Sequence, residues 1–180
     1  MTEIRPIRMR YNGVQFASTL EADWAATFDA WGWYWRYEPQ AVRLPSGTGY
    51  RADFQLPAQR VWAEVKGPHN ERIAKPAELQ QALGYDEWEW ANDLVVVLRA
   101  AGPGDVAVWE GTQPGQEIVM AVCPECERYG FMDYNGFWSC RYHMRKSREP
   151  NKFWMADGGA LYRSGELGFS RAPRPQRGAA

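Results

Sequence analysis

Five consecutive apolar residues, Leu94 to Leu98, limit the fold of this 180-residue chain more than any other feature. An apolar run of this length, without alternation, is typical of a β-strand that is buried on both faces. Such a strand needs a layer of structure on each side of its sheet. Because a helical pattern precedes the run, and strand-like segments precede that helix, we predict an α/β or α+β sandwich with a central mixed sheet.

Two helices are expected to accompany this sheet. Ser18-Thr19-Leu20-Glu21 is a capping-box pattern that begins a helix, and apolar residues recur at helical spacing as far as Trp31. A second helix should begin near Pro76, which suits a first-turn position, and should end near Ala91. Residues 1–17 are expected to be a polar lead-in that could include a short strand. The other strands are expected at residues 33–38, 41–44, 50–56, 61–66, 93–99 and 106–109.

Three charged residues interrupt two of these strands, which a short loop at residues 57–60 joins as a hairpin. Asp53 lies on the first strand, and Glu64 and Lys66 lie two residues apart on the second. Because side chains alternate across a strand, Glu64 and Lys66 should point to one face while Val65 points into the core. Antiparallel pairing can bring Asp53 beside them. The repulsion between the two carboxylates would be removed by a hard divalent cation such as Mg²⁺.

The same spacing also fits a surface hairpin whose charged side chains are merely solvated. Glu64 and Lys66, however, are flanked by Trp62, Ala63 and Val65. Charges inside an apolar strand are unfavourable unless they are paired or bound to metal. The combination therefore favours a site in which the carboxylates bind metal. Lys66 would orient or deprotonate an attacking water, or stabilise the transition state of phosphodiester cleavage.

The run Tyr50-Arg51-Ala52-Asp53-Phe54, with Trp62-Ala63-Glu64-Val65-Lys66-Gly67 after it, resembles the core motif of the PD-(D/E)XK nuclease superfamily. That superfamily includes restriction enzymes, Holliday-junction resolvases and recombination exonucleases. The resemblance covers roughly residues 15–110. It implies a restriction-endonuclease-like αβββαβ core with the metal at the hairpin. Ala52 stands where the family usually has a proline before the aspartate.

Other residues match the family pattern in part. Glu21, on the first helix, resembles an acidic residue that often completes the metal site, although the capping box with Ser18 uses the same side chain. Gln81 and Tyr85, at positions i and i+4 of the second helix, resemble the Gln-x-x-x-Tyr motif of the recombination-exonuclease branch. The groups of that motif touch substrate or catalytic residues. A polar helix face with a core tyrosine explains so short a pattern somewhat better, and Gln80 is a competing candidate.

A second motif lies after residue 115, where the composition changes. Cys123, Cys126, Cys140 and His143 form a C-x2-C-x13-C-x2-H pattern that uses all three cysteines of the chain. Thiolates and an imidazole at this spacing suit a closed, tetrahedral, structural Zn²⁺ site, which we favour over free buried thiols. Asn135-Gly136 is a hairpin signal between the ligand pairs. We predict a small zinc-ribbon-like module.

We therefore expect a nuclease core at residues 1–115, a zinc-ribbon-like module at 116–160 and a flexible basic tail at 161–180. With 21 basic and 22 acidic residues there is no global attraction for nucleic acid, so contacts with DNA must come from local patches. One candidate patch interleaves basic with aromatic residues; a solvated face is the alternative. Its members are Arg141, Tyr142, Arg145, Lys146, Arg148, Lys152, Phe153 and Trp154.

These observations predict a deoxyribonuclease dependent on Mg²⁺ or Mn²⁺, acting as an endonuclease or an exonuclease. An RNA-directed nuclease is a further possibility, and a homodimer would suit cleavage of both strands. A non-catalytic DNA-binding adaptor that keeps the nuclease fold is the alternative from another class, although a full set of Asp, Glu and Lys argues against it. No apolar run of membrane-spanning length and no secretory signal are present, so we expect a cytoplasmic protein without membrane contact.

Overall fold

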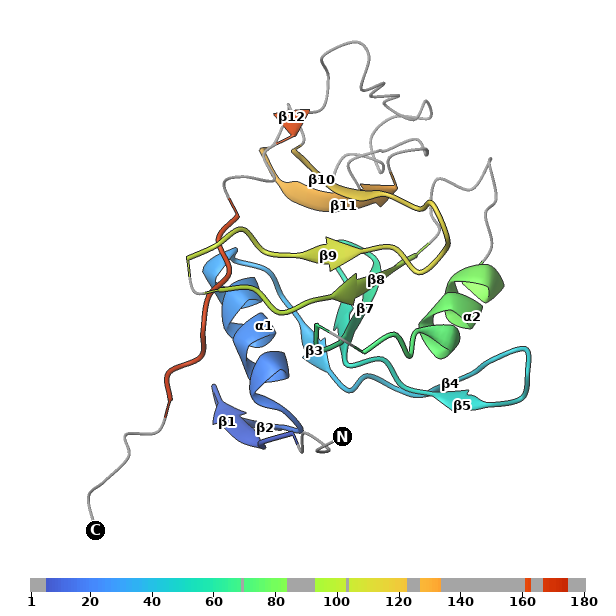
Figure 1. The fold of residues 1–180 in the computed structure, drawn as a ribbon, viewed down its shortest axis with the longest axis horizontal. Coiled ribbons are helices and arrows are strands. Elements are labelled where there is room, and N and C mark those ends of the chain that lie inside the picture. The colour runs from blue at the N-terminus through green and yellow to red at the C-terminus, as the bar shows by residue number, and fades with distance from the viewer. Residues whose placement is uncertain are drawn as a thin grey trace.

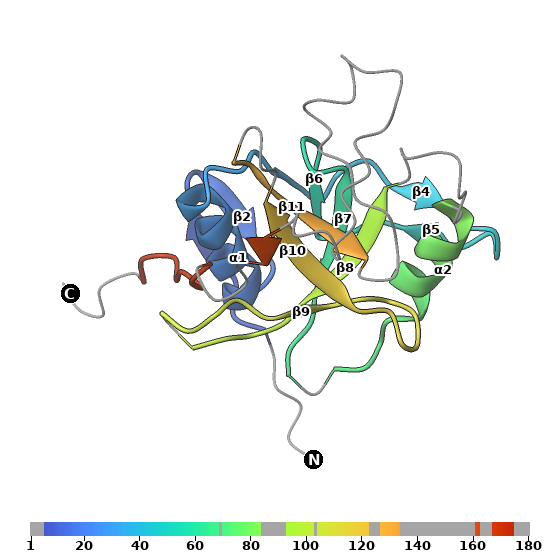
Figure 2. The ribbon, with the colours of Figure 1, turned by 90° about the horizontal axis from the view of Figure 1, so that it is seen from above.

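A computed structural model describes residues 6–68, 70–83, 93–102, 104–122, 127–133, 161–162 and 167–174. Within them, two helices lie on opposite faces of a five-stranded mixed sheet (Figures 1 and 2). Helix α1 spans Thr19–Ala30 and helix α2 spans Ala74–Leu83. The predicted α+β class with a central mixed sheet is therefore confirmed.

The central sheet has the strand order β3-β6-β7-β8-β9. Its strands are β3 (Arg36–Tyr37), β6 (Phe54–Leu56), β7 (Val61–Val65), β8 (Leu94–Leu98) and β9 (Trp109–Glu110). Only β7 and β8 pair in parallel; the other neighbours are antiparallel. The chain passes through α2 between these two parallel strands, as a parallel connection requires.

Strand β8 is buried on both faces, as its apolar run predicts. Val96 and Leu98 belong to the main core, which also contains the buried face of α1. Val95 belongs to a smaller cluster on the other face, together with Leu79 of α2. Each helix therefore covers one side of the same strand.

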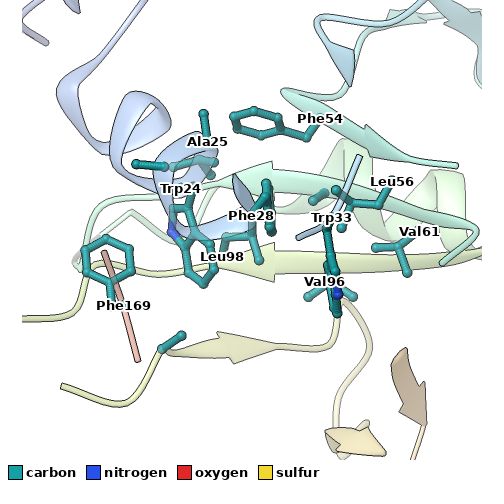
Figure 3. Packing of buried hydrophobic residues seen from close by; sticks show 14 of the residues in the cluster. Trp24, Ala25, Phe28, Trp33, Phe54, Leu56, Val61, Val96, Leu98 and Phe169 are labelled. Carbon is teal, nitrogen blue, oxygen red and sulfur yellow. The ribbon is translucent and has the colours of Figure 1, made fainter. Parts of the chain in front are cut away.

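Helix α1 begins where the capping-box pattern places it. Ser18 is the N-cap, and its hydroxyl accepts a hydrogen bond from the backbone N–H of Glu21 at 3.2 Å. Aromatic side chains from this helix fill the main core, in which the ring centroids of Phe28 and Phe54 lie 5.4 Å apart (Figure 3). The predicted helix boundaries differ from the observed ones by about one residue.

Two small antiparallel hairpins lie outside the central sheet. In the first, β1 (Met9–Tyr11) pairs with β2 (Val14–Phe16) around Asn12 and Gly13, whose φ angles of 47° and 81° suit a tight hairpin turn. In the second, β4 (Val42–Arg43) pairs with β5 (Gly49–Tyr50). A continuous strand over residues 50–56 is therefore a wrong prediction: Tyr50 ends one hairpin, and β6 begins only at Phe54.

A third sheet has the order β11-β10-β12, formed by β10 (Ile118–Val122), β11 (Tyr129–Asp133) and β12 (Leu161–Tyr162). Residues in this part of the chain were expected in the zinc module. Ile118, Met120 and Phe131 nevertheless join the main core. The ring of Phe131 lies 5.5 Å from that of Trp33. The hairpin of β10 and β11 thus shares its apolar contacts with the central sheet and helix α1.

Residues 167–174 are packed against α1, so the prediction of a flexible tail is wrong for this segment (Figure 1). Leu167, Phe169 and Ala172 are buried, and the rings of Phe169 and Trp24 lie 5.3 Å apart. Backbone hydrogen bonds join the segment to residues 104–107. Arg174 pairs with the buried Asp23 at 2.7 Å. We call residues 167–174 the C-terminal strap.

Smaller differences concern the ends of elements. The strand expected at 33–38 is limited to Arg36–Tyr37, and α2 begins two residues before Pro76. Val106 forms an isolated bridge with Gly168, and the strand expected at 106–109 begins only at Trp109. The predicted end of the second helix near Ala91 lies outside the described residues. Among those that are described, no helix is long and apolar enough to cross a membrane.

Candidate active site

Glu64 and Lys66 form an ion pair at the end of β7. The Lys66 ammonium donates to Glu64 Oε1 at 2.5 Å. Both side chains are largely buried: 15% of the Lys66 side chain and 11% of the Glu64 side chain is exposed. Val65, between them, packs into the main core on the opposite face. The predicted alternation along this strand is therefore confirmed. The backbone N–H of Lys66 donates to the carbonyl of Leu98 at 2.9 Å, which continues the pairing with β8 by one residue.

The second oxygen of Glu64 accepts a hydrogen bond from a tyrosine. The Tyr50 hydroxyl donates to Glu64 Oε2 at 2.6 Å. Burial and the negative charge of Glu64 raise the pKa of Tyr50 well above its usual value, so the phenol stays protonated and acts as the donor. Each carboxylate oxygen of Glu64 therefore has a donor from a different part of the chain.

Asp53 lies beside this pair, one residue before β6. Its Oδ2 accepts a hydrogen bond from the backbone N–H of Val65 at 2.7 Å. Because Phe54 pairs with Ala63, the hairpin register places Asp53 opposite the end of β7 that carries Glu64. The structure thus brings Asp53, Glu64 and Lys66 to one end of the β6–β7 hairpin.

The electrostatic environment of Asp53 favours its neutral form. Burial and the negative charge of Glu64 are the main causes that raise the pKa of Asp53 from 3.8 to about 7. The N–H of Val65 and the positive charge of Lys66 oppose this shift, whereas Glu21 adds to it. Two mutually repelling carboxylates, one of them protonated near neutral pH, are a frequent signature of a functional site.

Glu21 makes the local contacts of a helix cap and also lies near this site. Its Oε1 accepts from the Ser18 hydroxyl at 2.7 Å, and its Oε2 accepts from the N–H of Ala17 at 3.1 Å. The Tyr37 hydroxyl also donates to Oε2, at 2.5 Å. The negative charge of Glu21 nevertheless acts on Asp53. The capping interaction expected from the sequence is therefore present, while the additional role as a metal ligand stays a prediction.

Arg99 fixes the loop that follows Lys66. Its guanidinium donates to the carbonyl of Gly67 at 3.0 Å and to that of Asn70 at 2.7 Å. The same side chain forms an ion pair with Glu110 of β9. Strand β8 therefore restrains the backbone around Lys66 in two places. Leu98 accepts from the N–H of Lys66, and Arg99, which directly follows β8, binds the carbonyls of Gly67 and Asn70.

The two glutamines of α2 have different environments. Gln80 is buried, and its side-chain oxygen accepts from the N–H of Val95 at 2.7 Å, which ties α2 to β8. Gln81 is exposed. Tyr85, the other half of the expected motif, lies outside the described residues. Gln80 therefore joins α2 to the sheet through a hydrogen bond. The substrate contact of Gln81 and Tyr85 stays a prediction.

The predicted zinc ligands Cys123, Cys126, Cys140 and His143 all lie outside the described residues. Within the residues that are described, no group of three or more His, Cys, Asp or Glu side chains is arranged to hold a metal ion. Mg²⁺ often binds through only one or two carboxylates and completes its shell with water and substrate phosphate. A pair such as Asp53 and Glu64 is therefore a sufficient protein contribution for that ion.

Sequence reasoning identified Asp53, Glu64 and Lys66 but assigned no role to Tyr50, Tyr37 or Arg99. No local pattern distinguishes a tyrosine that binds a carboxylate from one that packs in a core. Their partners become evident only from pairing between distant segments. Comparison of the chain with protein-family models, with curated proteins and with solved structures finds no match.

Proposed function

We propose that this protein is a Mg²⁺-dependent nuclease that hydrolyses phosphodiester bonds of DNA. The observation that carries the proposal is the gathering of Asp53, Glu64 and Lys66 at one end of the β6–β7 hairpin, where burial and Glu64 raise the pKa of Asp53 to about 7. Burial of two carboxyl groups beside an amine is unfavourable unless the groups are paired or bind a metal, and such clusters are frequent at functional sites. The charges of a solvated surface hairpin have no such requirement.

The order of the elements supports the resemblance to PD-(D/E)XK nucleases. Helix α1 is followed in the central sheet by the antiparallel strands β3, β6 and β7, with the separate β4–β5 hairpin inserted between β3 and β6. Then come α2 and β8, which is parallel to β7. This is the helix–three strands–helix–strand order that the resemblance implies for its core. Asp53 precedes the middle strand of the meander, and Glu64 and Lys66 lie at the end of the third.

The residues present fit a magnesium ion. Asp53 and Glu64 offer hard oxygen donors, and their mutual repulsion is the kind that a divalent cation relieves. When bound, Mg²⁺ would supply a water of lowered pKa and would offset negative charge on the phosphate. Mn²⁺ has the same preference for oxygen ligands and should replace it.

Lys66 would contribute the positive charge of the site. Its ammonium, held by Glu64 at 2.5 Å, lies on the face of β7 that also carries the carboxylate. From there it can donate a hydrogen bond to an attacking water or to a phosphate oxygen. Without metal the pKa of Asp53 is about 7, so Mg²⁺ binding near neutral pH would displace a proton from this carboxyl group.

The nucleic-acid part of the proposal draws on the cysteine–histidine motif and the basic-aromatic segment after it. In the sequence, Cys123 and Cys126 come between the end of β10 at Val122 and the start of β11 at Tyr129. A Cys-x2-Cys pair in the connection of a hairpin is the expected position for one half of a zinc-ribbon site. We propose that Cys140 and His143 complete a structural Zn²⁺ site and that the module helps to bind DNA.

A cleavage assay tests the function directly. Purified full chain is incubated with linear, nicked, branched and single-stranded DNA and with RNA, each with Mg²⁺, with Mn²⁺ and without divalent ions. We expect cleavage of DNA that requires the metal and is lost in Asp53→Asn and Lys66→Met. The matched controls are Glu38→Gln and Lys75→Met, which remove one exposed carboxylate and one exposed amine and should keep full activity.

Two results would contradict the proposal. Undiminished cleavage by Asp53→Asn or Lys66→Met would show that the chemistry lies elsewhere. DNA binding without any metal-dependent cleavage would favour the alternative of a non-catalytic adaptor. Cleavage of RNA alone would retain the site but change the substrate.

A further inference from the structure

We infer that Tyr50 is a positioning residue, which orients the Glu64 carboxylate for metal binding through its hydroxyl group. This inference rests on the proposed function of the site. Tyr50 stands at the start of the run that resembles the nuclease motif, but the resemblance assigns it no role. It belongs to the separate β4–β5 hairpin instead of the central sheet. Its role is therefore an independent feature of this chain.

The contacts of Glu64 leave the carboxylate little freedom to rotate. Tyr50 donates to Oε2 at 2.6 Å, while Lys66 donates to Oε1 at 2.5 Å. Lys66 has a long, flexible side chain, whereas the Tyr50 ring is buried and has only two side-chain torsions. Tyr50 is thus the more rigid of the two donors and the one that can define the plane of the carboxylate.

The position of the Tyr50 hydroxyl is itself fixed by packing on α2. The Tyr50 ring lies in a buried cluster with Leu44, Leu79 and Val95. At the tip of the β4–β5 hairpin, Ser46 donates to Glu78 of α2 through its backbone N–H at 2.6 Å and through its hydroxyl at 3.0 Å. The hairpin therefore has an anchor at each end, and the hydroxyl approaches Glu64 from a rigid support.

A neutral donor suits this task. A hydrogen bond to one oxygen uses one of its lone pairs and leaves the rest of the carboxylate available to a cation. Unlike the Lys66 ammonium, the phenol adds no positive charge that would repel a metal ion. Groups that orient a metal ligand in this way typically change metal affinity by about 10–100-fold when they are removed.

The test compares two tyrosine-to-phenylalanine variants. Tyr50→Phe removes the hydroxyl from Glu64 and keeps the buried ring. Tyr11→Phe removes a hydroxyl that donates to Asp29 at 2.9 Å, a tyrosine–carboxylate contact in another part of the fold, and is the matched control. Mn²⁺ binding to the full chain is measured by calorimetry, and heat that persists in Asp53→Asn defines binding at other sites. Thermal unfolding and the Mg²⁺ concentration for half-maximal cleavage are measured in parallel.

We expect Tyr50→Phe to weaken Mn²⁺ binding by about tenfold or more and to raise the Mg²⁺ requirement by a similar factor. Tyr11→Phe should bind Mn²⁺ as the wild type does. If Tyr50→Phe does not fold, Ser46→Ala, which loosens the anchor on Glu78, should produce a smaller change in the same direction.

Unchanged Mn²⁺ affinity in Tyr50→Phe, or in Ser46→Ala when only that variant folds, would overturn the inference. The proposed function would survive that result as long as wild-type protein cleaves DNA and loses Mn²⁺ binding on Asp53→Asn. Equal Mn²⁺ binding by wild type and Asp53→Asn would instead remove both the metal site and the role of Tyr50.

Discussion

The substitution Asp53→Asn should make the metal-free protein more stable near neutral pH while it abolishes cleavage. Asparagine keeps an oxygen that can accept from the N–H of Val65 but carries no charge beside Glu64. In the wild type, folding raises the pKa of Asp53 from 3.8 to about 7. The carboxylate is therefore more easily ionised in the unfolded chain, and its ionisation opposes folding.

The pH dependence follows from the sign of this shift. Because the folded pKa is the higher one, the contribution of Asp53 to stability is fully present below about pH 4 and is lost as the pH rises to about 7. The full shift of about three pKa units corresponds to about 4 kcal/mol. Between about pH 5 and about pH 8, the wild type should lose about 2.5 kcal/mol that Asp53→Asn does not lose.

Urea denaturation in buffer without added divalent ions, at those two pH values, measures this difference. We expect the stability gap between variant and wild type to widen by about 2.5 kcal/mol from about pH 5 to about pH 8. Addition of Mg²⁺ should then stabilise the wild type and leave Asp53→Asn unchanged. A gap that is independent of pH would show that Asp53 is not held in a charge-repelling environment, and the electrostatic reasoning would be wrong.

Three further predictions concern the Glu64–Lys66 ion pair, the C-terminal strap and the zinc motif. Lys66→Met should lower the free energy of unfolding in urea by about 3 kcal/mol, because it leaves Glu64 without its cation. Adding Glu64→Gln should recover much of that loss, and no recovery would contradict the ion-pair reasoning. Phe169→Ala should lower the free energy of unfolding by about 3 kcal/mol, and a negligible change would mean that the C-terminal strap is not part of the core. Elemental analysis should find one Zn²⁺ per chain and less than half of that in Cys126→Ser, whereas equal zinc in both proteins would refute the four-ligand assignment.

The features that could be predicted from sequence are those set by local patterns. The capping box at Ser18 and Glu21 marks the start of α1 because both interactions lie within one turn of helix. The apolar run of β8 predicts burial on both faces because no polar residue offers an alternative. The alternation of Glu64, Val65 and Lys66 likewise decides which side chains share a face.

Features that depend on which strand segments pair with each other could not be predicted from local patterns. The sequence of residues 50–56 resembles a single strand, but Tyr50 pairs with Val42 whereas Phe54 pairs with Ala63. The register of a strand is not contained in its own sequence. The contact of Tyr50 with Glu64 is a consequence of that division. It could not be inferred from either residue alone.

Two further features left a signal that was not used. Asn12-Gly13, between the alternating residues Met9, Tyr11, Val14 and Phe16, is a strong hairpin pattern, and β1–β2 forms there. In the C-terminal strap, Leu167 and Phe169 alternate with polar or small residues, although the Pro- and Arg-rich composition around them indicated flexibility. Composition describes an average, and two well-placed apolar side chains are enough to fix a short segment.

The attachment of the C-terminal strap to α1 affects how a newly made chain can fold. Thr27 meets Ser170 across 143 positions of sequence, and Asp23 meets Arg174 across 151. At about 5–20 residues per second, a ribosome needs roughly 7 to 30 s to produce that intervening stretch. During this delay Trp24 lacks its Phe169 neighbour, so the nascent helix presents an aromatic surface to which chaperones can bind.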